Sequence, residues 1–151
     1  NDEARMRGTY VAQATQFYDE GTLDYDALDD ELKPYVMAWE KFLVDNYVKV
    51  EAIEKMVSNR SRRYAGTSDR LAKVGRWNYV IDIKTGSKAP WHSLQTAAYA
   101  ECLTGRYRYR ASILLGGDGN YKFEKHDCPS DRDVFLSALN LYHWKAEKGL
   151  L

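Results

Sequence analysis

The spacing of apolar residues changes at Val48, and this change limits the folds that the chain can adopt. Over residues 3–20 and 32–47, apolar side chains recur every three or four positions, which is the period of an amphipathic helix. From Val48 they alternate with polar ones, which predicts a strand with Val48, Val50, Ala52 and Glu54 on one face. The sequence therefore predicts two helices followed by a sheet.

The rest of the chain continues this mixed pattern. Glycine-rich links separate segments that alternate with period two, and two longer segments have helical spacing. These segments are strands at 62–74 and 76–85, a helix at 90–105, a hairpin of strands at 106–115 and 121–127, and a helix at 130–149. The expected order is α-α-β-β-β-α-β-β-α, an α/β fold with a mixed central sheet of about five strands flanked by helices.

The totals exclude several classes of protein. With 151 residues, 44% of them hydrophobic, we expect one domain over residues 1–151, and its first residue, Asn rather than Met, is consistent with N-terminal trimming. The 22 basic and 22 acidic residues cancel, so a polyanion could bind only at a local patch. Cys102 and Cys128 are too few for an iron–sulfur cluster. No apolar run reaches about 18 residues, so we expect an intracellular protein without a membrane partner.

The stretch VIDIKTGSK, residues 80–88, places an acid and a base in an apolar strand. Residues i and i+2 of a strand share a face, so Asp82 and Lys84 point to one side and Ile81 and Ile83 to the other. One interpretation is a salt bridge on a solvated sheet face, which contributes about 0–1 kcal/mol to stability. The other is a functional site.

A second carboxylate favours the functional site. Two antiparallel strands joined by a short turn can bring Asp69 beside Asp82, and like charges at that separation repel unless a proton or a cation lies between them. Carboxylate oxygens suit Mg²⁺ or Mn²⁺, and the carbonyl of Ile83 could complete the coordination. Lys84 would then hold a water molecule or a phosphate oxygen near the metal. Glu54, on the preceding strand, is a candidate third acid or else a partner of Lys55 or Arg70.

Three motifs in order carry a resemblance to a known family. GTSD at 66–69, DIKTG at 82–86 and QTAAY at 95–99 together resemble the PD-(D/E)XK nuclease superfamily, in its RecB-like exonuclease branch with bacteriophage relatives. The resemblance implies a restriction-endonuclease-like fold, Mg²⁺ or Mn²⁺ as cofactor, and a cytoplasmic enzyme of a bacterial or phage-infected cell. DNA is the implied partner, with recombination or replication proteins as further candidates.

The resemblance also implies roles for individual residues. Asp69 and Asp82 would bind the metal, and Lys84 would orient or activate the attacking water. Gln95 and Tyr99, four residues apart on one helix face, would hold the DNA strand or the active-site network. Without the resemblance, these two are equally well read as a surface residue and a buried tyrosine.

One position departs from the pattern of this branch. Four residues after the glycine of the first helix, at Gly8, the branch usually has a histidine that ligates the metal, and this chain has Ala12. Three explanations remain open: the metal is held without a histidine, Gln13 compensates, or the residue was altered to disarm the enzyme. The substitution puts the full activity of this chain in question.

A DNA substrate would also need to be bound by residues outside the metal site. Basic and aromatic residues near the expected site are candidates, because arginines contact phosphates and aromatic rings stack on unpaired bases. These candidates are Arg60, Arg62, Arg63, Tyr64 and Trp91. The sequence thus predicts a metal-dependent exonuclease for single-stranded DNA or DNA ends in recombination, repair or replication; the alternatives are a catalytically silent DNA-binding or scaffold module and a purely structural α/β domain.

Overall fold

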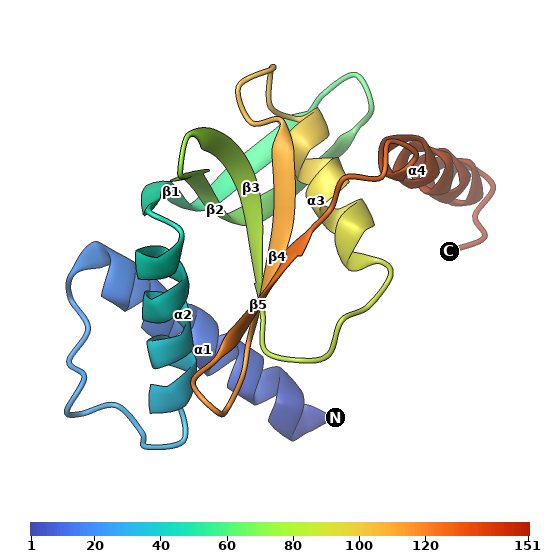
Figure 1. The fold of residues 1–151 in the computed structure, drawn as a ribbon. Helices are drawn as coiled ribbons and strands as arrows, with labels where there is room; N and C mark the ends of the chain where they lie inside the picture. Colours follow the sequence, from blue (N-terminus) through green and yellow to red (C-terminus); the bar gives the residue numbers. More distant parts are fainter.

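A five-stranded sheet separates two layers of helices in the computed structural model, which describes residues 1–151 (Figure 1). The elements follow one another in the predicted order. They are α1 Asp2–Glu20, α2 Lys33–Asp45, β1 Val48–Asn59, β2 Tyr64–Val74, β3 Trp77–Lys84, α3 His92–Glu101, β4 Tyr109–Leu115, β5 Tyr121–Lys125 and α4 Asp131–Glu147. The predicted α/β class with a mixed sheet is confirmed.

The strands lie in the sheet in the same order as in the chain, β1-β2-β3-β4-β5. The pairs β1–β2, β2–β3 and β4–β5 are antiparallel, whereas β3 and β4 are parallel. A parallel pair needs a crossover connection, and α3 is the helix in that connection. The loop that leaves β3 and the start of α3 therefore lie together at one end of the parallel pair.

The main hydrophobic core lies between the sheet and the α1–α2 layer. Trp39 and Phe42 of α2 are fully buried, with ring centroids 5.3 Å apart, and they pack with Ile81 of β3 and Ile113 of β4. Gly21 ends α1 with a φ of 73°, a conformation that glycine adopts without a steric penalty. These contacts anchor the face of β3 that carries Ile81, so the alternate face carrying Asp82 is turned toward α3.

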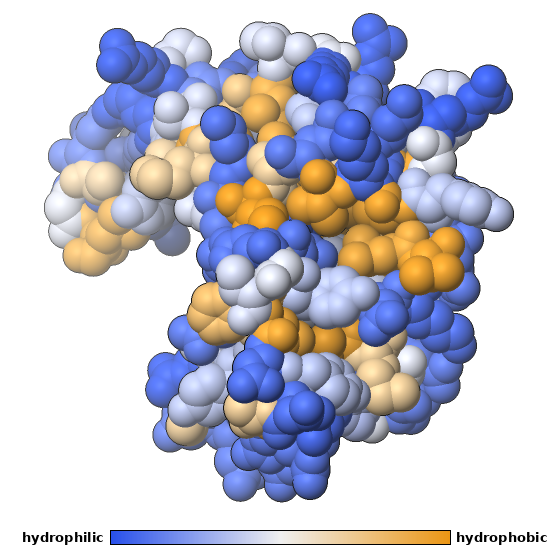
Figure 2. All heavy atoms as spheres, turned by 90° about the vertical axis from the view of Figure 1, so that its left-hand side faces the viewer, coloured by the Kyte–Doolittle hydropathy of each residue, from blue (hydrophilic) through white to orange (hydrophobic).

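The second helical layer is α3 with α4 packed against it (Figure 1). Ala97 and Ala98 are buried, and such small side chains let α3 lie close to the sheet. None of the four helices is long and apolar enough to cross a membrane. Figure 2 shows the side of the molecule that lies at the left of Figure 1, where apolar atoms form an interrupted band between hydrophilic surfaces.

The predicted alternation along β1 is wrong beyond Val50. The pairing of β1 with β2 shifts between Val50 and Ala52, and Glu54 has a positive φ of 48°. An irregularity of this kind turns the following side chains relative to the preceding ones. Val48 and Val50 pack against the core as expected, whereas Ala52 and Glu54 do not continue that face.

Candidate active site

A cavity of about 440 Å³ opens where β3 ends, between α1 and α3. Its two carboxylates, its ammonium group and Ile83 come from the central strands β2 and β3, and its other residues come from the two helices and from the loop after β3. The lining includes Asp69, Asp82, Ile83, Lys84, Ala12, Thr85, His92 and Gln95. The structure therefore brings together the predicted residues of β2, β3 and the start of α3.

The cavity exists because β2 and β3 separate at this point. Their pairing runs from Val74 opposite Trp77 to Arg70 opposite Ile81 and stops there, although both strands continue. The backbone N–H of Ile83 donates a hydrogen bond to Asp69 Oδ2 at 2.8 Å instead of to a strand carbonyl. The interruption of the ladder thus fixes one carboxylate of the candidate site.

Asp82 is buried beside Lys84. Its side chain is 3% exposed, and its Oδ2 atom lies 2.8 Å from Lys84 Nζ. The approach does not have the angle of a hydrogen bond, and this buried oxygen has no hydrogen-bond partner. The acid–base pair of the sequence is real, but the interpretation that it lies on a solvated sheet face is wrong.

A chain of polar contacts leads from Lys84 into α3. Lys84 Nζ donates to Gln95 Oε1 at 2.9 Å, and Gln95 Nε2 donates to the Tyr99 hydroxyl at 3.0 Å. A Cβ atom at Gly66 of β2 would lie 2.8 Å from Tyr99 Cε1, so glycine is required for the ring to pack there. The three motif residues are therefore joined in one network that orients the ammonium group.

The two carboxylates are close enough to affect each other's protonation. Burial, together with the negative charge of Asp82, raises the pKa of Asp69 from 3.8 to about 7, although the Ile83 N–H and Lys84 act in the opposite direction. A divalent cation would relieve both the repulsion and the unpartnered Asp82 oxygen. The donors present therefore fit Mg²⁺ or Mn²⁺.

The protein supplies few ligands for such a cation. No three His, Cys, Asp or Glu side chains come together in a group that could hold a metal. Mg²⁺ commonly binds through one or two carboxylates and keeps water molecules and substrate phosphates as its other ligands. Asp69 and Asp82 match that pattern, and Ile83 lines the same cavity.

Glu54 does not line the cavity. Its carboxylate lies 3.7 Å from Arg70 Nη1. Burial, followed by the charge of Asp69, raises the pKa of Glu54, and Arg70 lowers it. Two roles were predicted for Glu54. The structure supports the role of ion-pair partner to Arg70, and it does not place Glu54 among the residues that could bind a metal.

A buried ion pair supports the site from behind. The fully buried Arg70 donates from Nε to Asp19 Oδ2 of α1 at 2.7 Å and from Nη1 to the carbonyl of Asp69 at 2.7 Å. Asp19 also accepts from Trp39 Nε1 at 3.0 Å. The network ties α1 and α2 to the strand that carries Asp69. Sequence reasoning missed it, because Arg70 and Asp19 are 51 positions apart.

The first helix reaches the cavity at the predicted position. Ala12 lines it together with Gly8, whose added Cβ would lie 3.7 Å from Thr85 Oγ1. Gln13 is exposed and is not part of the lining. The position at which the resembling family has a histidine thus lines the same cavity as the carboxylates, and Gln13 does not replace it.

His92 also lines the cavity, although the sequence had indicated it only as a ring that could stack on unpaired bases and not as a metal-binding or catalytic residue. It begins α3, is 7% exposed, and its Nδ1 accepts from the N–H of Ala89 at 3.4 Å. Burial, with Lys84 nearby, lowers its pKa, so the ring is neutral at pH 7. Arg5 of α1 and Thr85 also line the cavity. Thr85 directly follows the D-x-K motif, which could have identified it.

The predicted DNA-binding residues lie outside the cavity. Arg62 lies 3.8 Å from Glu101 and Arg63 3.5 Å from Glu147, both as ion pairs. The Tyr64 hydroxyl donates to the carbonyl of Ala98 at 2.8 Å, and its ring packs edge-on against Phe135. Arg60 and Trp91 are exposed, Trp91 next to His92 at the start of α3. The structure therefore gives Tyr64 a packing role and leaves Arg60 and Trp91 free for contacts.

The cavity thus combines adjacent carboxylates, an ammonium group and an amide on one side of a buried strand. Such a set can hold a divalent cation and stabilise negative charge on a bound phosphate. Neither a protein-family model nor a curated protein matches the chain.

Proposed function

We propose that the protein is a metal-dependent DNA nuclease that hydrolyses phosphodiester bonds of single-stranded DNA or of DNA ends. The observation that carries the proposal is the meeting of Asp69, Asp82, Lys84 and Gln95 in one cavity where β2 and β3 separate. The motif resemblance to RecB-like nucleases supports the same reaction and gives DNA as the substrate.

Each of these cavity residues would have its own role in phosphodiester hydrolysis. Asp69 and Asp82 would hold Mg²⁺ or Mn²⁺, which when bound would act as a Lewis acid and lower the pKa of a water molecule. Lys84 places a positive charge where negative charge develops on the phosphate, and preorganised charge of this kind is usually the largest catalytic term. Gln95 keeps the Lys84 ammonium in place through the 2.9 Å hydrogen bond.

The test is cleavage of an end-labelled single-stranded oligonucleotide with Mg²⁺ or Mn²⁺, compared with EDTA. We expect metal-dependent cleavage that Asp82→Ala abolishes and Lys84→Ala strongly reduces. Asp133→Ala is the control, since this carboxylate is 79% exposed on α4 and away from the cavity. Cleavage that Asp82→Ala leaves unchanged would show that the site assignment is wrong.

A second function is favoured by one feature, the alanine at the mouth of the cavity. Ala12 has no ligand atom, so the protein would hold the cation with two carboxylates and could bind DNA without cutting it. This catalytically silent DNA-binding module predicts retained oligonucleotide binding and no cleavage. Cleavage that appears only in Ala12→His would support this reading for the present chain and still assign the cavity to the nuclease reaction.

A further inference from the structure

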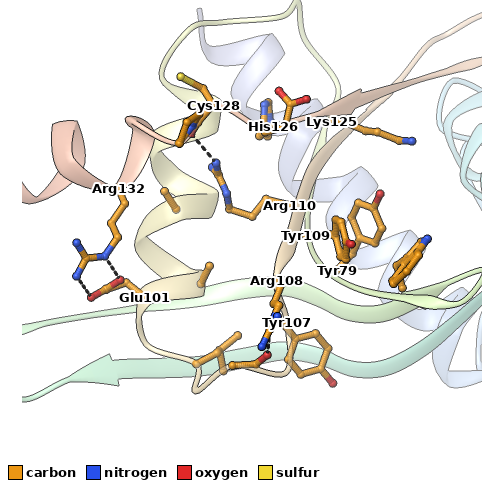
Figure 3. A pocket seen from close by; sticks show the side chains of 17 residues that line it. Tyr79, Glu101, Tyr107, Arg108, Tyr109, Arg110, Lys125, His126, Cys128 and Arg132 are labelled. Atoms are coloured by element: carbon orange, nitrogen blue, oxygen red, sulfur yellow. Dashed lines mark hydrogen bonds and ion pairs between the residues drawn. The ribbon is translucent and has the colours of Figure 1, made fainter.

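A second cavity, of about 650 Å³, lies at the other end of the β3–α3–β4 unit. Its walls come from the starts of β3 and β4, the end of β5 and the last turn of α3 with the segment after it (Figure 3). Asp82 and Lys84 are at the opposite end of β3, five or more residues from Trp77. At about 3.3 Å per residue, Trp77 lies about 17 Å along the strand from Asp82.

Three aromatic rings form a row in this cavity. Tyr79 and Tyr109 are paired across the parallel strands, with stacked rings whose centroids are 5.4 Å apart, and Trp77 follows at 5.2 Å from Tyr109. Figure 3 shows the rings of Tyr79 and Tyr109 next to each other on the same side of β4. The exposed fraction rises along the row, from 5% for Tyr79 to 41% for Tyr109 and 50% for Trp77. The outer two rings are therefore partly exposed to solvent.

The opposite wall is held in place by ion pairs. Arg110 donates to Asp131 at 2.9 Å and to the carbonyl of Cys128 at 3.4 Å. Arg132 makes two hydrogen bonds with Glu101, at 2.6 and 2.9 Å (Figure 3). These charges are compensated within the protein, so they shape the cavity rather than contribute charge to it.

The remaining charges give the cavity an excess of positive charge. Arg108 and Lys125 line it and form no ion pair, and Arg76, also without an ion pair, lies 5.7 Å over the ring of Trp77. The lining contains one acid without an ion pair, Asp127. Two uncompensated cations and two half-exposed aromatic rings thus line the same cavity, and Arg76 adds a third cation beside Trp77. A ligand that fits them has a planar ring and an anionic group.

We propose that this cavity is a second DNA-binding site, which holds a nucleotide of single-stranded DNA away from the catalytic cavity. The base stacks on Trp77 and Tyr109, and the adjoining phosphate contacts Arg108 and Lys125. A volume of about 650 Å³ lies within the range of small-ligand sites. Stacking requires an accessible base face, so the site selects single strands over duplexes. The choice of DNA rests on the proposed nuclease function, whereas binding at this site does not require hydrolysis.

The test measures binding of fluorescein-labelled oligo(dT), about 20 nucleotides long, by anisotropy in EDTA, so that no cleavage occurs. We expect Trp77→Ala to raise the Kd about tenfold, which is within the range for loss of one base–aromatic stack. Trp144→Ala is the matched control, because Trp144 is also 50% exposed but lies on α4. Trp77→Phe retains a ring and is expected to bind more tightly than Trp77→Ala.

A second variant tests the charge and does not depend on the packing of Trp77. Arg108 is exposed and donates only to the carbonyl of Gly105, so Arg108→Ala is expected to fold normally. If Arg108 contacts a phosphate, its removal lowers the slope of log Kd against log salt concentration by about 0.7. Lys148→Ala, an exposed cation at the end of α4, should leave the slope unchanged.

The outcomes separate this site from the nuclease proposal. Unchanged binding and an unchanged salt slope in both Trp77→Ala and Arg108→Ala would overturn it. Duplex DNA binding as tightly as the oligonucleotide would also overturn it, since the bases of a duplex are stacked on one another and are not accessible to the rings. Binding in EDTA that depends on Trp77 supports the site even if the protein cleaves nothing in Mg²⁺ or Mn²⁺.

Discussion

Raising the pH from about 5 to about 7 should destabilise the metal-free protein through Asp69. Burial and the neighbouring Asp82 raise the pKa of Asp69 from 3.8 to about 7, so the folded protein keeps a proton that the unfolded chain loses near pH 4. A raised carboxyl pKa contributes stability at low pH, and this contribution is lost as the pH rises through the pKa of the folded state. The loss is complete above about pH 7.

The size of the effect follows from the shift. Between about pH 5 and pH 7 the unfolded Asp69 is ionised and the folded one is protonated, which costs about 1.4 kcal/mol per pH unit. Two units therefore lower the free energy of unfolding by about 2–3 kcal/mol, a large part of the roughly 5–15 kcal/mol of a typical domain.

Urea denaturation in EDTA at several pH values measures this quantity. Asp69→Asn keeps an oxygen for the Ile83 N–H but cannot ionise, so its stability should lack this component of the pH dependence. Asp133→Asn, an exposed carboxylate on α4, should behave as the wild type does. Mn²⁺ should stabilise the wild type more at pH 8 than at pH 5, because the cation competes with the proton. Identical pH dependence in the wild type and Asp69→Asn would refute the reasoning.

Three further predictions follow from the same surroundings. Ala12→His should tighten Mn²⁺ binding measured by calorimetry, because a ligand is added to the lining of the cavity; unchanged affinity would contradict the placement of α1. Arg70→Met should lower the free energy of unfolding in urea by about 3–5 kcal/mol, since it leaves the buried Asp19 carboxylate without its cation; adding Asp19→Asn should restore part of the loss. Gly66→Ala should displace Tyr99, which its Cβ would approach to 2.8 Å, and cost about 1–3 kcal/mol; an unchanged melting temperature would argue against this packing.

The fold could be predicted from the sequence because its signals are local. Helical spacing, strand alternation and glycines at the turns lie within short segments, and all nine elements were found in order. The exception is β1, where the register shift between Val50 and Ala52 and the positive φ of Glu54 break the alternation. An irregularity of this kind depends on the partner strand, so a pattern along one strand does not reveal it.

The candidate site could be predicted in part for a similar reason. Asp69 and Asp82 lie on one hairpin, and Gln95 and Tyr99 lie one turn apart on one helix, so spacing alone places each pair together. Contacts between distant segments left no such signal. The pairing of Arg70 with Asp19 and the entry of His92 into the cavity depend on how α1 and α3 pack on the sheet.

The placement of the charged residues decides how the zero net charge should be interpreted. Several arginines near the β1–β2 turn and α4 form ion pairs within the protein. Glu101 pairs with Arg62 and Arg132, and Glu147 pairs with Arg63. Three other cations form no ion pair: Arg76 lies over Trp77, and Arg108 and Lys125 line the cavity that Trp77 and Tyr109 also line. A balanced total therefore conceals a local excess of positive charge, and the position of that excess beside exposed rings favours a single strand over a duplex as the ligand.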